Sequence, residues 1–189
     1  MSTPIFGDLL DAMKHAAAAL RDSEIPFALA GSFAVYARGG PETSHDVDFI
    51  LLPDDAERAL DVLAKSGFRA EKPPEGWLYK VFDDQDSMID LIFSPNGAGP
   101  DVVQEILDRA DVIEVYAIKL KVMSATDVLA SKLLALREHY VDYEAPLEVA
   151  RALREQIDWD VLASRTSGSP YADAFFTLAR GLGLAPTQP

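Results

Sequence analysis

The chain has 189 residues, of which 31 are acidic and 17 are basic, and its formal net charge at pH 7 is −14. A body this acidic repels nucleic acid at long range and argues against non-specific binding of DNA or RNA. The absence of cysteine excludes disulfides and thiolate metal sites. No apolar run approaches the roughly 20 residues needed to cross a bilayer, and no secretory signal is visible at the N-terminus. We therefore expect a cytoplasmic protein with no membrane partner.

The spacing of apolar residues predicts alternating helices and strands in the first two thirds of the chain. Helices are expected at residues 3–21, 32–37, 54–67 and 101–110, and apolar residues recur at helical intervals in the first and third of these segments. Strands are expected where apolar runs or alternating patterns occur, at residues 25–30, 45–52, 68–70, 77–82, 88–93 and 112–118. The acidic segment 83–87 predicts a hairpin turn.

The last third of the chain is predicted to be helical. Residues Ser124 to Asp127 have the pattern of a capping box at the start of a helix. An apolar stripe continues along that helix through Leu129, Leu133, Leu136 and Tyr140. Further helices are expected at 144–156, 158–165 and 169–181, the last two capped by Asp158 and Ser169. We thus expect a small mixed α/β sheet flanked by helices over residues 1–122 and a C-terminal helical domain over residues 123–189.

Two aspartates, Asp46 and Asp48, stand on a predicted strand that is otherwise apolar. Because successive side chains alternate across a strand, both point to one face, with Cα atoms roughly 6.6–7 Å apart. Two like charges on one face are unfavourable unless a cation lies between them. The alternative is an exposed strand face with both acids in water, which fits poorly with the apolar neighbours Val47, Phe49 and Ile50.

Asp90 is a natural third member of this acidic group, because it interrupts an apolar strand expected to lie beside that of Asp46 and Asp48. Three carboxylates on adjacent strands can hold two hard cations about 3.5–4 Å apart. Mg²⁺ is favoured, since it takes oxygen ligands and keeps water and substrate phosphates in its shell. The alternative for Asp90 alone is a surface acid at a strand end.

The order of these motifs carries a resemblance to a known superfamily. Gly31-Ser32 lies at a strand-to-helix turn, Asp46-x-Asp48 begins 14 residues after Ser32, and Asp90 follows on a later strand. This pattern resembles that of the polymerase-β-type nucleotidyltransferases. The resemblance implies the α/β (α+β) nucleotidyltransferase fold. It also implies transfer of a nucleoside monophosphate from a nucleoside triphosphate (NTP) to an acceptor hydroxyl, with release of pyrophosphate.

The resemblance also implies roles for individual residues. Asp46, Asp48 and Asp90 would bind Mg²⁺, with Mn²⁺ as the alternative ion, and Asp90 would serve the acceptor hydroxyl as its base or orienting group. The backbone amides of Gly31-Ser32 and the Ser32 hydroxyl would hold the triphosphate, as a helix N-terminus can do. The alternative for Gly31-Ser32 is an ordinary tight turn with a helix cap.

Phosphate contacts are expected from basic residues elsewhere. Many members of the superfamily carry a basic residue four positions before the first aspartate, where this chain has Glu42. Arg38 and Lys132 are therefore the candidates to neutralise the phosphates. Lys132 matches the lysine on the helical segment of related proteins, although it could instead only extend along the helix surface towards solvent.

The function is open between three alternatives, two of which differ in the acceptor. The segment that carries Lys132, Arg137, Arg151 and Arg154 is similar to small bacterial toxins of the AbiEii/MenT type, which implies transfer to tRNA 3′ ends and a cognate antitoxin. The acidic body suits instead a cationic small molecule, as in aminoglycoside or lincosamide nucleotidyltransferases. A non-catalytic nucleotide-binding or partner-binding module is the third alternative, and the intact group of three acids argues against it. DNA is not an expected partner.

Overall fold

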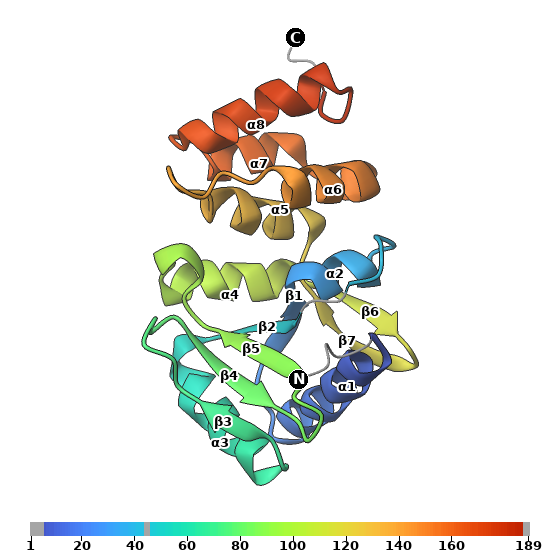
Figure 1. Cartoon of the computed structure of the whole chain (residues 1–189), viewed down its shortest axis with the longest axis vertical. Coiled ribbons are helices and arrows are strands. Elements are labelled where there is room, and N and C mark those ends of the chain that lie inside the picture. The colour runs from blue at the N-terminus through green and yellow to red at the C-terminus, as the bar shows by residue number, and fades with distance from the viewer. Residues whose placement is uncertain (1–5, 44–45, 187–189) are drawn as a thin grey trace.

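A seven-stranded mixed sheet forms the centre of the structure, a computed structural model that describes residues 6–43 and 46–186 (Figure 1). The strand order is β3-β4-β5-β2-β1-β7-β6. β2 runs parallel to β5, β1 runs parallel to β7, and the other neighbouring pairs are antiparallel. The strands are β1 (Phe27–Ala30), β2 (Val47–Leu51), β3 (Arg69–Glu71), β4 (Leu78–Phe82), β5 (Met88–Ile92), β6 (Asp111–Val115) and β7 (Ile118–Val122).

Helices cover both faces of this sheet. α1 (Phe6–Asp22) and α3 (Ala56–Lys65) lie on one face, and α4 (Pro100–Arg109) lies on the other (Figure 1). The short helix α2 (Gly31–Ala37) follows β1 directly. α1 is amphipathic as its sequence predicts, since its buried residues recur at helical spacing, and they include Leu9, Met13, Ala16 and Leu20.

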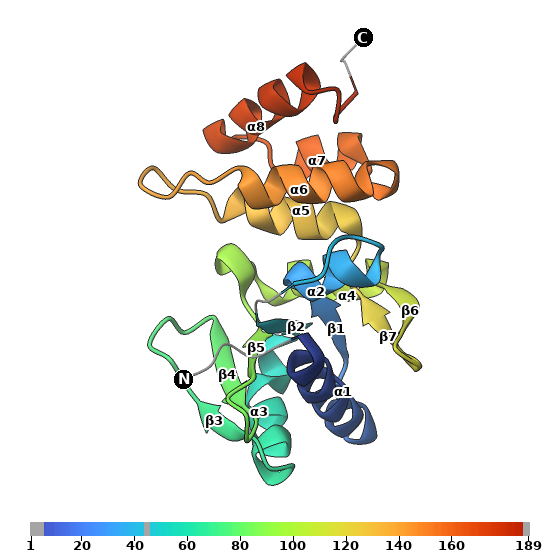
Figure 2. The same ribbon diagram turned by 45° about the vertical axis from the view of Figure 1, so that its right-hand side comes forward.

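Four helices stack beyond α2 and α4 in both views of the molecule (Figures 1 and 2). They are α5 (Ala125–Leu134), α6 (Glu144–Leu153), α7 (Trp159–Arg165) and α8 (Pro170–Gly181). The predicted caps are confirmed: Ser124, Asp158 and Ser169 each accept a hydrogen bond from the backbone amide three residues later. None of the helices in the described ranges is long and apolar enough to cross a membrane.

The buried apolar residues of the described chain, except Leu78, form a single cluster that includes side chains of the sheet and of the helical stack. The change from sheet to helices falls between β7 and α5, close to the expected boundary at residue 122. The division into two domains stays a prediction. The expected start of the first helix at residue 3 and the strand residue at 45 lie outside the described residues.

The strand predicted over residues 112–118 is confirmed only as far as residue 115, and its continuation to 118 as one strand is wrong. That region contains two antiparallel strands, β6 and β7, joined by Tyr116 and Ala117. Both residues have positive φ, 46° and 66°, which is the backbone of a tight hairpin turn that usually selects Asn-Gly. The Tyr116 side chain is held by a 2.8 Å hydrogen bond between its hydroxyl and that of Tyr36. Because Tyr-Ala is no turn signal, the sequence pattern did not reveal the hairpin.

The helix predicted to continue to Tyr140 is also shorter than expected. α5 ends at Leu134, and the chain reverses so that Arg137 and Tyr140 form a small antiparallel bridge. Tyr140 is 73% exposed and does not extend the apolar stripe. The Arg137 guanidinium donates to the carbonyl oxygens of Leu134 and Leu136, which satisfies acceptors that a helix leaves unpaired at its C-terminus.

Candidate active site

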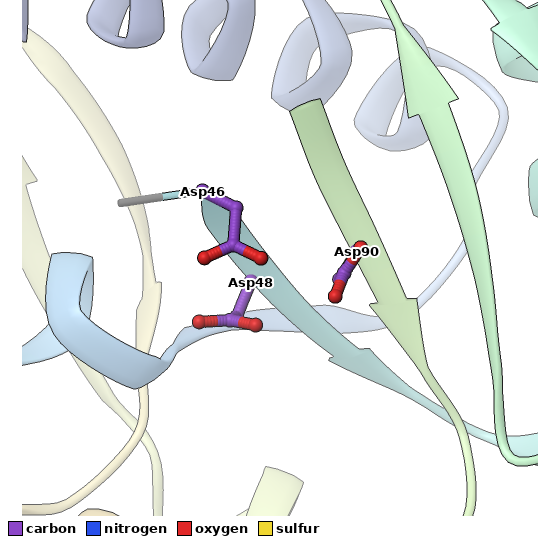
Figure 3. Close-up of side chains that lie close together, drawn as sticks. All are labelled: Asp46, Asp48 and Asp90. Carbon is purple, nitrogen blue, oxygen red and sulfur yellow. The ribbon is translucent and has the colours of Figure 1, made fainter. Parts of the chain in front are cut away.

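The three predicted carboxylates come together near the start of β2, beside the neighbouring strand β5 (Figure 3). Asp90 on β5 lies directly opposite Asp48 on β2 in the parallel register. Asp46 precedes the first residue of β2, so its expected place on the strand is off by one position, and its side chain still points towards Asp48. One oxygen from each of the three carboxylates lies within 4.8 Å of the others.

Burial makes this acidic group electrostatically unfavourable without a cation. Asp90 is 6% exposed, and Asp46 and Asp48 are half-buried. Burial, together with the neighbouring charges of Asp46 and Asp90, raises the pKa of Asp48 to about 8. Burial also raises the pKa of Asp90. Each of these carboxyl groups would be ionised more readily beside a positive charge.

The donor set fits a hard divalent cation. All three side chains offer carboxylate oxygens, they converge on one point, and their mutual repulsion would be relieved by an ion bound between them. Mg²⁺ and Mn²⁺ both accept such oxygen ligands.

The close approach of the chain to Asp48 requires glycine at position 31. Its φ is +54°, and a Cβ atom added there would lie 1.7 Å from Asp48 Oδ2. Ala30 is the register partner of Asp48 on β1, so the turn into α2 passes directly over the Asp48 carboxylate. Only glycine tolerates both this backbone conformation and this close approach. The glycine of the Gly31-Ser32 motif therefore shapes the acidic site itself.

A cavity of about 500 Å³ opens beside the acidic group and is lined by Gly31, Asp48 and Lys132, among others. Lys132 comes from α5, whereas Gly31 and Asp48 belong to the sheet and its turn. Much of the remaining wall is apolar, including Ile50 and Trp77. The cavity thus offers a charged end and an apolar wall, which suit a phosphate group and a planar base respectively.

Ser32 faces a second, smaller cavity of about 70 Å³. Lys132 lines this cavity as well, together with Glu42 and Glu148. Lys132 therefore lies between the two cavities. The structure brings Gly31 and Lys132 to the large cavity with Asp48, and it places Ser32 in the adjoining one.

Arg38 is not brought to either cavity. Its guanidinium donates to the carbonyl oxygens of Met123 at 2.7 Å and Val122 at 2.9 Å, and it forms an ion pair with Asp111 at 2.7 Å. The Arg38 side chain is only 7% exposed. It ties α2 to the connection between β7 and α5, and its charge is already used in these contacts.

Lys80 is a site residue that the sequence analysis missed. It lies on β4 opposite Asp90 in the antiparallel register, and its Nζ is 2.8 Å from Asp90 Oδ1 and 3.1 Å from Oδ2. The alternating pattern of residues 77–82 predicts the strand correctly, but a lysine within it looks like any exposed charge. Which side chain faces which across two strands depends on the register, and one strand alone does not reveal it.

Several solved structures have a similar fold. The antibiotic-resistance factor ANT(2″)-Ia, solved with adenylyl-2″-tobramycin, aligns with a TM-score of 0.57 and 12% identity over 89% of this chain and 97% of its own. The lincosamide antibiotic adenylyltransferase LnuA, solved with lincomycin, gives 0.52 and 12% identity over 72% and 91%. A Thermotoga maritima protein assigned as a nucleotidyltransferase gives 0.51 and 14% identity over 96% and 97%.

At these low identities the structures establish the fold, and the expected nucleotidyltransferase fold is confirmed. No curated protein matches the chain by sequence. The resemblance to toxins of the AbiEii/MenT type is not confirmed and stays a prediction. A family model described as "Uncharacterised nucleotidyltransferase" matches residues 9–187. Because that match spans nearly the whole sequence, the chain belongs to this family of nucleotidyltransferases.

Proposed function

We propose that the protein transfers a nucleoside monophosphate from an NTP to a hydroxyl group of an acceptor at the site of Asp46, Asp48 and Asp90. The observation that carries this proposal is the convergence of the three carboxylates within 4.8 Å beside a cavity that Lys132 also lines. In the reaction the acceptor oxygen bonds to the α-phosphorus and its hydroxyl proton passes to solvent, while the bond between that phosphorus and the bridging oxygen breaks and pyrophosphate leaves.

Each residue has a distinct task in this proposal. Asp46, Asp48 and Asp90 would hold Mg²⁺ or Mn²⁺, which when bound would neutralise phosphate charge and polarise the α-phosphate. The Lys132 ammonium would donate to the phosphates at the charged end of the cavity. Asp90 would accept a hydrogen bond from the acceptor hydroxyl and orient its oxygen. Gly31 keeps the chain clear of the Asp48 carboxylate.

A cationic small molecule is the acceptor that the charge of the protein favours. The net charge of −14 attracts cations and repels polyanions. The fold is similar to that of an enzyme solved with adenylyl-2″-tobramycin and one solved with lincomycin, which supports the same class of acceptor.

The 3′ end of tRNA is the second candidate, within a toxin that would have a cognate antitoxin. The resemblance of the helical segment around Lys132 to toxins of the AbiEii/MenT type supports it. Binding of tRNA would require local basic contacts strong enough to overcome the acidic body.

Label transfer tests both candidates in one experiment. The protein is incubated with each α-³²P-labelled NTP, Mg²⁺ and either total tRNA or a panel of aminoglycosides and lincosamides. Label on a drug supports the first acceptor, and label on tRNA supports the second. Asp48→Asn should abolish labelling, whereas Asp84→Asn on the exposed β4–β5 turn should not. Labelling that survives in Asp48→Asn would reject the assigned site.

A further inference from the structure

The acidic group is in contact with a positively charged side chain, that of Lys80. In the described chain, Lys80, Asp90 and Asp48 occupy one row across β4, β5 and β2, because Lys80 is the register partner of Asp90 and Asp90 is that of Asp48. Directly opposed residues on neighbouring strands project from the same face of a sheet. The pairing of β4 with β5 thus places the Lys80 ammonium beside the Asp90 carboxylate.

The contact between Lys80 and Asp90 uses both oxygens of the carboxylate. The distances from Lys80 Nζ are 2.8 Å to Oδ1 and 3.1 Å to Oδ2, and the same Nζ lies 3.4 Å from the Met88 sulfur. The side chains are 25% and 9% exposed, so water screens this ion pair only partly. Lys80 therefore holds Asp90 in one orientation on the side away from β2.

This contact changes how many divalent ions the site can hold. The ammonium reduces the charge of the three ionised carboxylates from −3 to −2, which one divalent cation balances. A second divalent ion on Asp90 would have to share a carboxylate whose two oxygens already accept from Lys80. The two positive charges would then lie within a few ångströms of each other and repel strongly.

We propose that Lys80 occupies the place of a second divalent ion on Asp90, so that the site binds one divalent ion, held mainly by Asp46 and Asp48. Lys80 acts as a positioning residue, because it fixes the Asp90 carboxylate and contacts none of the reacting atoms. This inference rests on the metal site of the proposed function and assigns that site a single metal ion, where three carboxylates alone would allow two.

Counting bound Mn²⁺ tests the inference without turnover. Free Mn²⁺ is measured by electron paramagnetic resonance during titration of the protein, alone and with α,β-methylene-ATP or α,β-methylene-CTP. The wild-type chain should bind one Mn²⁺ at the site. Lys80→Met, which keeps the length of the side chain and removes its charge, should bind a second Mn²⁺ at least tenfold more tightly than the wild type does.

Two further variants separate charge from structure. Lys80→Arg keeps the charge and should still bind one Mn²⁺. Lys72→Met removes an exposed lysine that pairs with Glu57, away from the acidic group, and should bind one as well. Circular dichroism and thermal unfolding should confirm that each variant is folded.

The failures of the two proposals are distinguishable. Two Mn²⁺ ions bound equally well by the wild type and by Lys80→Met would overturn the inference and leave nucleotidyl transfer untouched. No Mn²⁺ bound by any variant would overturn the metal site of both proposals. A count of one in the wild type and two in Lys80→Met, without label transfer to any acceptor, would reject the proposed reaction and retain the role of Lys80.

Discussion

At the scale of single residues, Asp48 is the side chain on which the geometry of the site depends most. It faces Asp90 across the strand pair, it is approached by Asp46, and the turn at Gly31 passes against its carboxylate. Such crowding of a half-buried acid costs stability in the absence of a cation. Binding of a metal ion with its substrate would relieve this cost, because strain of this kind is found mainly at functional sites.

The raised pKa of Asp48 should make the metal-free protein less stable as the pH rises. In the folded chain Asp48 keeps its proton up to a pKa of about 8, whereas in the unfolded chain its pKa returns to about 3.8. Between these values unfolding releases a proton, so a rise in pH favours the unfolded state. The contribution is at most about 1.4 kcal/mol per pH unit and is smaller for a half-exposed group.

Thermal unfolding in EDTA at pH 5.5, 6.5 and 7.5 measures this effect. The melting temperature of the wild type should fall with pH more steeply than that of Asp48→Asn, which cannot titrate. Added Mn²⁺ should raise the wild-type melting temperature most at pH 7.5. Equal slopes for the wild type and Asp48→Asn would show that Asp48 is ionised in the metal-free fold.

Gly31→Ala should damage the metal site as well as the backbone. The new Cβ would lie 1.7 Å from Asp48 Oδ2, so the carboxylate must move. We expect Mn²⁺ affinity to fall about ten- to hundredfold, the range seen when groups that orient metal ligands are lost. Isothermal titration with Mn²⁺ measures the change.

Gly39→Ala is the matched control for Gly31→Ala. Gly39 also has a positive φ, +98°, but nothing lies within 4 Å of its added Cβ. Both variants should lose about 1–2 kcal/mol of stability from the unfavourable backbone conformation, and only Gly31→Ala should lose metal affinity. Equal metal affinity in the two variants would remove the special role of Gly31.

The residues of the site were predictable to the extent that their chemistry is local. Asp46 and Asp48 stand out because acids interrupt an apolar strand, and Asp90 stands out for the same reason. Lys80 and Arg38 were not predictable in their roles. Lys80 meets Asp90 through strand register, and Arg38 meets Val122 and Met123 through the packing of α2, neither of which a local pattern encodes.

At the scale of elements, the sequence predicted the starts of helices well and the places where the chain reverses direction poorly. Ser124, Asp158 and Ser169 cap their helices as their sequence positions indicate, because a cap depends on residues three apart. The β6–β7 turn at Tyr116-Ala117 lacks turn residues and is supported by a contact with Tyr36, 80 positions away in the sequence. Local propensity is overridden there by tertiary contacts.

Asp127 joins three elements, α4, α5 and α7, and should be costly to remove. It is 3% exposed, it accepts from Arg109 of α4 at 3.0 and 3.2 Å, and it also accepts from Arg165 of α7. Asp127→Ala leaves two cations without their shared partner, and breaking a fully buried ion pair costs about 3–5 kcal/mol. Because the side chains of Arg109 and Arg165 are 33% and 25% exposed, urea unfolding should show a loss near the lower end of that range.

Asp173→Ala provides the comparison for Asp127→Ala. Asp173 is an exposed acid in the first turn of α8, and its removal should change stability by less than about 1 kcal/mol. A loss in Asp127→Ala no larger than that in Asp173→Ala would mean that the contacts of Asp127 contribute little to joining α4, α5 and α7.

At the scale of the whole molecule, the candidate site is assembled from two parts of the chain. The sheet supplies the three carboxylates and the turn at Gly31, and α5 of the helical stack supplies Lys132. Both parts belong to one buried cluster. The mixed sheet followed by helices was predictable from periodicity, whereas the position of Lys132 against the sheet depends on how α5 packs.

Substitution of Lys132 should therefore change nucleotide affinity and leave metal affinity nearly unchanged. In Lys132→Met the carboxylates of the sheet stay in place, so Mn²⁺ affinity in the absence of nucleotide should change less than about threefold, since the charge of Lys132 acts on Asp48 only at a distance. Loss of a charged donor to phosphate should weaken nucleotide binding by about 1.5–3 kcal/mol, or roughly ten- to a hundredfold in Kd.

Lys119→Met, which removes an exposed lysine of β7 far along the sheet, should change neither affinity. Titration of each variant with Mn²⁺ alone and then with α,β-methylene-ATP or α,β-methylene-CTP measures both constants. Nucleotide binding unchanged in Lys132→Met would mean that the helical stack closes the cavity without contacting the phosphates.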